Sequence, residues 1–275
     1  MLKFELSPLE YQHLTEFIYQ KTGLRFAAGK EYYLNARVGK RLQELGVDNF
    51  RQYFNFLRFG SPEKELELLI NSITVNETYF FREYNQLKCF AEEVLPLLAK
   101  ELKAGERLKV WSAGCSSGEE PYTLAIILTE MLEVSGINFE VHGTDINTLA
   151  LHKAKKGCYE KRSLREMPEE YLQKYFLPKD ALYQVRPQLK EHVHLYQLNL
   201  KDEKAMEAMR GFHSIFCRNV LIYFDDQSRR EAALGFYRAL LPGGFIFLGH
   251  SESMGRISNL FKPLRFKEAI IYQKR

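Results

Sequence analysis

Residues Trp111–Tyr122 read WSAGCSSGEEPY, a run that leaves an apolar segment and ends on acidic residues. The apolar run Leu108–Ser112 is typical of a buried strand, and the residues after Gly118 have the character of a helix. A strand that turns into a helix through Gly114 and Gly118 brings main chain close to a ligand, because no side chain stands in the way. The stretch therefore predicts the first strand–turn–helix unit of an α/β fold that binds a nucleotide-like ligand.

The sequence downstream has the same texture. Apolar runs rich in Val, Ile and Phe alternate with helix-like segments, which is the pattern of a mostly parallel sheet with helices on both faces. The expected strands are Leu108–Ser112, Phe139–Thr144, Val193–Leu198, Ser214–Cys217 and Phe245–Gly249, with one more near Ile270–Tyr272. A longer passage, about residues 158–192, contains an expected helix Pro168–Phe176 and an expected strand Ala181–Arg186. It is interpreted as a small inserted β-subdomain.

Upstream of about residue 75 the pattern is helical. Ser7, Pro8 and Glu10 predict the start of a first helix and Gly23 its end. Further helices are expected over Glu31–Leu45, Asn49–Phe59 and from Ser61-Pro62 to Ile70. Since no strand-like alternation is present, residues 1–75 are predicted to form a helical bundle and residues 76–275 the α/β domain.

The acids after the glycine turn indicate the class of ligand. A Walker loop needs a lysine followed by Ser or Thr after its last glycine, whereas Glu119 and Glu120 stand there. Two acids at a helix start oppose phosphates, and the spacing from Gly114 to Gly118 is not that of a dinucleotide fingerprint. S-adenosylmethionine fits better, because it is cationic and carries no phosphate. Asp145, expected at the tip of the next strand, can accept hydrogen bonds from its ribose.

Composition excludes several classes of protein. The chain has 275 residues, 45% apolar and 27% charged, as is ordinary for a globular protein. Lys and Arg number 39 against 35 Asp and Glu, an excess too small to favour binding to nucleic acid. Four widely spaced cysteines argue against structural zinc or a disulfide framework, so no metal site is expected. With no leader and no membrane-spanning run, a cytoplasmic protein without membrane insertion is expected.

Three further segments are more specific. They read TVNETYFFRE at residues 74–83, IFCRNVLIYF at residues 215–224 and LPGGFIFLGHSES at residues 241–253. In this order, with the glycine turn and Gly143–Asp145 between, they closely resemble the CheR family of chemotaxis methyltransferases. The resemblance covers nearly the whole chain and implies a Rossmann-like class I S-adenosylmethionine-dependent methyltransferase domain. It also implies methyl transfer to glutamate side chains of methyl-accepting chemotaxis receptors, with S-adenosylhomocysteine as the product.

The resemblance implies roles for individual residues. Cofactor contacts are expected from the glycine turn at Gly114 and from Asn76, Thr78, Arg82, Glu119, Glu120, Asp145, Asn199, Leu200, Arg218 and Asn219. Which of the two adjacent glutamates faces the cofactor stays open. Arg82 and Tyr223 match the positions beside the reacting methyl group and are the expected catalytic residues.

The expected chemistry needs no general base, because a glutamate with a pKa of about 4.3 is already ionised at neutral pH. Methyl transfer from a sulfonium to a carboxylate needs alignment and exclusion of water instead. We expect Arg82 to hold the substrate carboxylate or to organise the methionyl end of the cofactor. We expect the Tyr223 hydroxyl to orient the acceptor oxygen.

Two features bear on the partner. Arg37, Lys40 and Arg41 make the second helix basic, and in the CheR family the helical domain is implicated in recognising acidic receptor helices. These residues are therefore expected to steer docking. Some family members hold a receptor C-terminal pentapeptide on the inserted subdomain and carry a glycine-containing loop there. Residues 176–182, FLPKDAL, lack glycine, which favours an enzyme without this tether.

Two alternatives stay open on the sequence. One is a methyltransferase of the same fold that acts on another acceptor, such as a nucleic acid or a small metabolite. The net charge of +4 and the absence of an Asn-Pro-Pro-Tyr motif count against a nucleic acid. The other is a module that binds S-adenosylmethionine and signals without transferring its methyl group.

Overall fold

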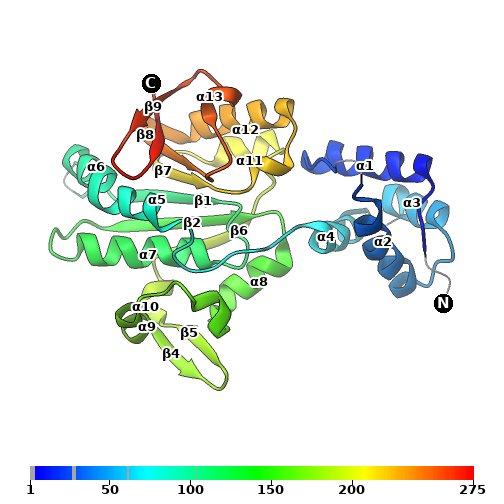
Figure 1. Ribbon diagram of the computed structural model, residues 1–275, viewed down its shortest axis with the longest axis horizontal. Helices are drawn as coiled ribbons and strands as arrows, with labels where there is room; N and C mark the ends of the chain where they lie inside the picture. The colour runs from blue at the N-terminus through cyan, green and yellow to red at the C-terminus, as the bar shows by residue number, and fades with distance from the viewer. Residues whose placement is uncertain (1–3, 27–28, 61, 104) are drawn as a thin grey trace.

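The computed structural model describes residues 4–26, 29–60, 62–103 and 105–275. Its larger part contains a seven-stranded sheet in the order β6-β2-β1-β7-β8-β10-β9 (Figure 1). The strands are β1 Leu108–Ala113, β2 Phe139–Asp145, β6 Val193–Gln197, β7 Phe212–Cys217, β8 Leu240–Leu248, β9 Phe261–Arg265 and β10 Ile270–Lys274. Neighbours from β6 to β8 pair in parallel, whereas β10 is antiparallel to both β8 and β9.

The predicted α/β class is confirmed, and each predicted strand is present. Strand β9 was not predicted, because Pro263 and the charged Lys262 and Arg265 interrupt any apolar pattern. It forms because it pairs along its length with β10, from Arg265 opposite Ile270 to Phe261 opposite Lys274. A proline is tolerated there because β9 is the last strand of the sheet.

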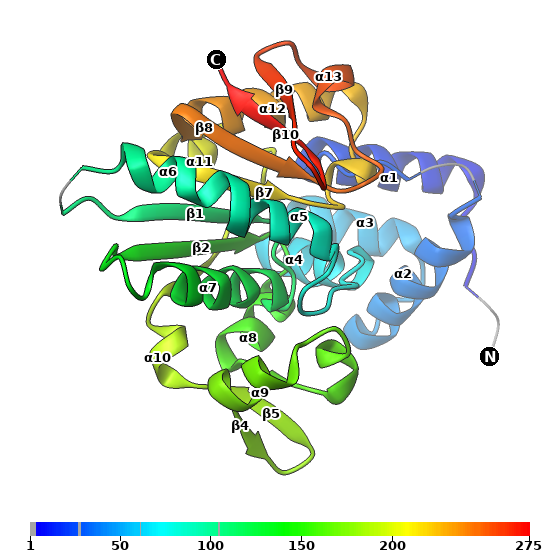
Figure 2. The ribbon, with the colours of Figure 1, turned by 60° about the vertical axis from the view of Figure 1, so that its left-hand side comes forward.

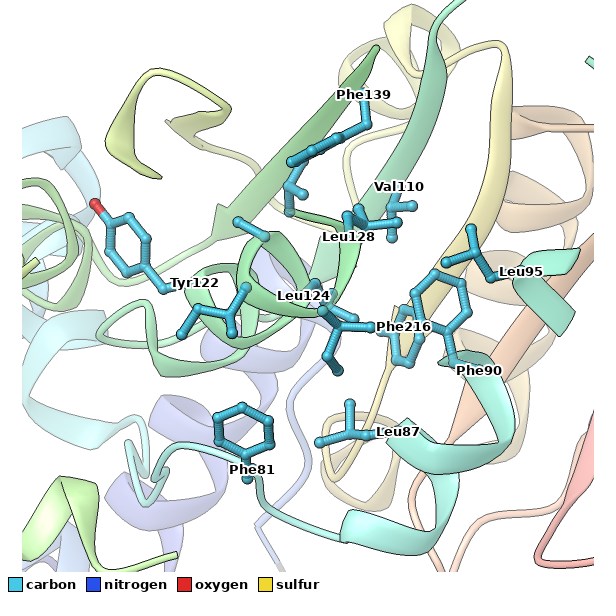
Figure 3. Packing of buried hydrophobic residues seen from close by; sticks show 14 of the residues in the cluster. Phe81, Leu87, Phe90, Leu95, Val110, Tyr122, Leu124, Leu128, Phe139 and Phe216 are labelled. Carbon is cyan, nitrogen blue, oxygen red and sulfur yellow. The ribbon is translucent and has the colours of Figure 1, made fainter. Parts of the chain in front are cut away.

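Helices cover both faces of this sheet (Figure 2). One face is covered by α5 Tyr84–Cys89, a π-helical turn Phe90–Val94, α6 Leu95–Glu101 and α7 Glu119–Leu132, and the other by α11 Glu203–Ala208 and α12 Asp226–Ala239. Side chains alternate between the faces: Val110 and Phe216 join the core under α7 (Figure 3), while Trp111 and Ile215 join the core under α12. This two-sided burial explains the near-continuous apolar runs in the sequence.

The predicted bundle is made of α1 Pro8–Thr22, α2 Glu31–Leu45, α3 Phe50–Phe59 and α4 Pro62–Ile73. Ser7 and Glu10 form a reciprocal capping box at the start of α1, and Gly23 ends it in a left-handed conformation. Of the expected start of α4, Ser61 lies outside the described residues. The helices enclose a core of their own, centred on Leu14, Leu34 and Tyr53.

The expected insertion is a three-stranded sheet in the order β3-β5-β4. Its elements are β3 Cys158–Tyr159, the 3-10 turn η2 Lys161–Leu164, α9 Glu169–Tyr175, β4 Phe176–Lys179, β5 Leu182–Val185 and α10 Pro187–Lys190. Asp180, with φ of 53°, supplies the left-handed residue of the tight turn between β4 and β5, so the hairpin closes without glycine. Strand β4 was not predicted, because Pro178 and Lys179 break its apolar run.

The bundle and the larger sheet are joined by hydrogen bonds at several places. Asn147, which caps α8 (Thr148–Lys156), donates from Nδ2 to Asn71 O (3.1 Å) and to Thr74 Oγ1 (2.7 Å). After α1, Arg25 N donates to Tyr223 O (2.8 Å). The bundle is thereby fixed against the carboxyl ends of the strands. None of the helices in the described residues is long and apolar enough to cross a membrane.

Candidate active site

A cavity of about 440 Å³ lies between the bundle and the carboxyl ends of the strands. Strand β1 has β2 on one side and β7 on the other, so the cavity opens where the strand order reverses, the usual ligand position in an open α/β sheet. It is lined by most of the predicted site residues, namely Asn76, Thr78, Arg82, Gly114, Glu120, Asp145, Asn199, Leu200, Arg218, Asn219 and Tyr223. Segments far apart in the sequence thus meet in one place.

The glycine turn forms the floor of this cavity. Gly114 has φ of 81°, and a Cβ there would lie 2.4 Å from Val220 Cγ2, so only glycine fits. Gly118 was expected to approach the ligand but does not line the cavity: its missing Cβ makes room for Ala154 at 2.7 Å instead. The second glycine therefore serves packing between α7 and α8, and the first one shapes the site.

Asp145 at the tip of β2 holds this turn together. Its Oδ2 accepts from Ser116 N at 2.7 Å and its Oδ1 accepts from Asn147 N at 2.8 Å. Burial raises the pKa of Asp145, and the main-chain donors at Asn147 and Ser116 oppose that shift. Because a carboxylate oxygen has more than one lone pair, each can still accept a hydroxyl from the cavity side.

The structure separates the two adjacent glutamates. Glu120 lines the cavity, where its Oε1 accepts from Ser112 Oγ (2.6 Å) and its Oε2 from Arg218 Nε (2.6 Å). Glu119 points elsewhere, is buried, and accepts from Ser117 Oγ at 2.7 Å. Burial raises the pKa of Glu119. Of the pair, only Glu120 is therefore placed toward the predicted cofactor site.

Arg218 ties three segments of the site together. Besides its bond to Glu120 at the start of α7, its Nη1 donates to the main-chain oxygen of Arg82 at 2.8 Å. The same nitrogen lies 3.7 Å from Glu83 Oε2. Its side chain is only 4% exposed, so it is a buried brace between β7, α7 and the segment that follows the bundle.

The backbone around Arg82 is unusual. Phe81 and Glu83, on either side of it, have φ of 58° and 57°, and both are non-glycine residues in the left-handed region. Such conformations cost on the order of 1–3 kcal/mol each and occur at functional sites where the surroundings enforce them. Here Thr123 Oγ1 accepts from Phe81 N (3.2 Å), and Arg218 fixes the Arg82 carbonyl.

Arg82 and Tyr223 both face the cavity. Arg82 donates from Nη1 to Glu77 O at 2.7 Å, which leaves further guanidinium donors for a ligand. Tyr223 is 36% exposed. Burial raises its pKa and the nearby Arg82 charge opposes this, so the phenol stays protonated at neutral pH and can donate a hydrogen bond.

Sequence reasoning did not single out the bundle residues that line the cavity, such as Arg25, Phe26 and Tyr33, nor Glu252, which supports residues that line it. Glu252 follows β8 and accepts at Oε2 from Asn219 N (2.8 Å) and Gly249 N (2.8 Å), and at Oε1 from Ile222 N (3.2 Å). It thus fixes the left-handed residue Asn219, with φ of 59°, and the 3-10 turn η3 (Leu221–Tyr223). The only signal in the sequence is the position of Glu252 in the segment that follows an expected strand, Phe245–Gly249.

The basic residues of α2 do not form the free group that was expected. Arg41 is buried, with a bidentate pair to Glu65 (Nε–Oε1 3.0 Å, Nη2–Oε2 2.7 Å) and a further contact to Glu44. It therefore holds α2 to α4 and is not available to a partner. Arg37 lies over the Tyr33 ring, with its guanidinium carbon 3.7 Å from the centroid, and Lys40 is exposed.

Comparison with known proteins gives a consistent result. The family model described as CheR methyltransferase, SAM binding domain, matches residues 76–270, and the CheR methyltransferase all-alpha domain matches residues 9–74. A Vibrio cholerae relative, chemotaxis protein methyltransferase 2, is 41% identical over 276 residues, covering 100% of this chain and 96% of the relative. Chemotaxis protein methyltransferases of Borreliella burgdorferi (35% identity, 97% of this chain, 96% of that protein) and Salmonella typhimurium (34%, 98% and 91%) are also similar. The chain therefore belongs to the CheR methyltransferase family and is an S-adenosylmethionine-dependent methyltransferase.

Proposed function

We propose that the protein transfers the methyl group of S-adenosylmethionine to glutamate side chains of chemoreceptors and forms glutamate methyl esters. One observation carries the proposal: Asp145, Glu120 and the Gly114 turn line the same cavity as Arg82 and Tyr223. The expected cofactor contacts (the donor wall) and the expected catalytic residues Arg82 and Tyr223 (the acceptor wall) thus line one cavity. A binding module that does not transfer methyl would have no need for the second wall.

The residues present suit this donor. The cavity volume of about 440 Å³ is within the usual range for a site that encloses a small ligand. Asp145 would accept from the ribose hydroxyls, and Glu120, although paired with Arg218, would offer its remaining carboxylate lone pairs to a donor on the cationic ligand. Asn76, Thr78, Asn199, Leu200 and Asn219 would complete the wall. When bound, S-adenosylmethionine supplies a methyl group attached to positively charged sulfur.

The protein's own residues would position the acceptor rather than activate it. A substrate glutamate is already ionised at neutral pH, so no side chain needs to remove a proton. Arg82 would hold the carboxylate in place, and the protonated Tyr223 would donate to one carboxylate oxygen and leave the other free to react. The bundle residues Arg25, Phe26 and Tyr33 close the cavity from the other side, which would exclude water.

The division into domains at about residue 75, a cytoplasmic location and an enzyme that needs no pentapeptide tether are proposed on sequence grounds. The short, glycine-free turn between β4 and β5 supports the last of these. Arg37 and Lys40, but not Arg41, are proposed to contribute to receptor docking, because Lys40 is exposed and Arg37 is partly exposed.

A methyl-transfer assay tests the proposal. The protein is incubated with S-adenosyl-[methyl-³H]methionine and a chemoreceptor cytoplasmic fragment, and the product is treated with alkali. Methyl esters release volatile tritiated methanol, whereas N-methyl groups do not. Incorporation that resists alkali would indicate another acceptor class, and no incorporation with intact cofactor binding would favour a non-catalytic module.

A further inference from the structure

A second concave surface lies beside the catalytic cavity. It is a groove of about 1140 Å³ between α8, the turn η2 and the segment that follows the bundle, and we call it the α8 groove. Its charged or ionisable lining residues are Glu77, Glu119, His152, Lys153, Lys155, Lys156, Arg162 and Arg165. Asn76, Glu77 and Thr78 line both the groove and the catalytic cavity, so the two are continuous.

The lining is strongly cationic for a protein with a net charge of only +4. Lys153, Lys155 and Lys156 are exposed, and in the described residues no carboxylate forms an ion pair with any of them. Arg162 pairs with Glu160 at 3.0 Å, but both side chains are well exposed, so that pair is weak. Glu119, which also lines the groove, interacts electrostatically with Lys153, so the positive potential of the groove is compensated only in part within the chain.

Local structure explains only part of this arrangement. Lysines in the last turn of a helix are favoured by the helix dipole, which accounts for Lys153, Lys155 and Lys156 on α8. It does not account for Arg162 in η2 and Arg165 directly after η2, which line the same groove. Arg165 is held there by its position over the Tyr79 ring, 3.6 Å from the centroid.

We infer that the α8 groove binds an acidic stretch of the receptor segment whose glutamate enters the catalytic cavity. This inference rests on the proposed function, because that function supplies an acidic protein substrate. A chain lying in the groove reaches the catalytic cavity across Asn76–Thr78 without leaving the protein surface. Complementary charge at such a surface speeds association and lowers KM, and salt weakens it.

The test reverses the charge of the groove. The variant Lys153→Glu/Lys155→Glu/Lys156→Glu is compared with a control, Lys262→Glu/Arg265→Glu/Lys267→Glu, in and after β9 at the opposite edge of the sheet. Both variants change the net charge equally. Initial rates with a chemoreceptor cytoplasmic fragment are measured at about 50 mM and about 0.5 M NaCl, and S-adenosylhomocysteine affinity by calorimetry.

We expect the groove variant to raise KM for the receptor fragment about tenfold at low salt, with kcat and cofactor affinity within about twofold of wild type. The difference should shrink at high salt, and the control should stay within about twofold throughout. The neutral variant Lys153→Gln/Lys155→Gln/Lys156→Gln, which keeps good helix formers, should give a smaller rise in KM and serves if the Glu variant does not fold.

Equal KM values for the groove variant and its control would overturn the inference. A second result would also overturn it: the wild-type protein binds phosphatidylglycerol vesicles, the groove variant does not, and KM for the receptor fragment is the same in both. That result would assign the groove to a membrane surface. Failure of the proposed function has a different signature, because the wild-type protein would then form no alkali-labile ester with the receptor fragment.

Discussion

Two buried arginines, Arg41 in the bundle and Arg218 at the catalytic cavity, look alike by burial and by partner. Each residue is 8% exposed, and each forms a short ion pair with a carboxylate. Arg41 binds Glu65 through Nε and Nη2, and Tyr53 donates to the same carboxylate at 3.0 Å. Arg218 divides its donors between Glu120 and the main chain of Arg82.

The difference lies in what each arginine connects. Arg41 joins two helices of one core, so its loss should loosen the bundle and leave the reaction chemistry intact. Arg218 joins Glu120 to the main chain of Arg82, a residue flanked by the left-handed residues Phe81 and Glu83. Burial of a charged side chain therefore does not by itself indicate a functional site, whereas the segments that it connects do.

The largest expected effect is on stability. Arg41→Ala leaves Glu65 buried without its cation, and breaking such a pair costs about 3–5 kcal/mol. We expect the free energy of unfolding in urea to fall by this amount, while kcat/KM of the folded protein stays within about twofold of wild type. The neighbouring exposed Lys40→Ala is the control and should change stability by less than about 0.5 kcal/mol. A large fall in kcat/KM of Arg41→Ala under conditions where the variant is fully folded would contradict the distinction between the two arginines.

At the active site the expected effect is on rate. Arg218→Lys keeps the charge but cannot bind Glu120 and the Arg82 carbonyl in the same planar geometry. We expect kcat/KM to fall about 100-fold, which corresponds to about 2.7 kcal/mol of transition-state stabilisation. The matched variant Arg41→Lys should keep kcat/KM within about twofold. Near-wild-type turnover in Arg218→Lys would show that the brace is not needed.

Glu252 extends the comparison to a carboxylate that holds only main chain. In Glu252→Gln an NH2 group replaces one of the two acceptor oxygens. If it replaces Oε1, the bond from Ile222 N is lost, and if it replaces Oε2, the bonds from Asn219 N and Gly249 N are lost. We expect kcat to fall about tenfold, because η3 with Tyr223 loses its anchor. Steady-state kinetics and circular dichroism separate this from unfolding. A variant with unchanged kcat would make Glu252 a purely structural cap.

The smallest effect concerns pH. Because burial raises the pKa of Asp145, its protonation and the loss of its acceptor capacity begin at a higher pH than for an ordinary aspartate. Affinity for S-adenosylhomocysteine should therefore be constant at neutral pH and weaken as pH falls through this raised pKa. Calorimetry on wild type and Asp145→Asn measures it, and the variant should bind weakly with a flatter profile. The same profile in both proteins would remove Asp145 from the ligand.

Much of the fold could be predicted because local signals were strong. Ser7, Gly23 and Gly46 mark helix ends through their own side-chain or backbone preferences, and the apolar runs mark strands buried on both faces. Strands β4 and β9 carry proline and charge, so their formation depends on partners that periodicity does not reveal.

Residues of the cavity could be predicted where they lie in a sequence motif. Residues whose role depends only on the folded geometry were not predicted. Asp145 and Arg82 lie in recognisable stretches, and the structure brings them to one cavity. Arg41 was misread because its partner Glu65 is distant in sequence, and a charge pattern on one helix does not show a partner on another. The role of Glu252 depends on three amides that only the folded chain brings together.

The most direct test of the account is a crystal structure of the protein with S-adenosylhomocysteine. The ribose is predicted to lie against Asp145, and the sulfur is predicted to point toward the space between Arg82 and Tyr223. Ligand density outside the cavity between Gly114 and Asp145, or a sulfur turned away from Arg82 and Tyr223, would contradict it.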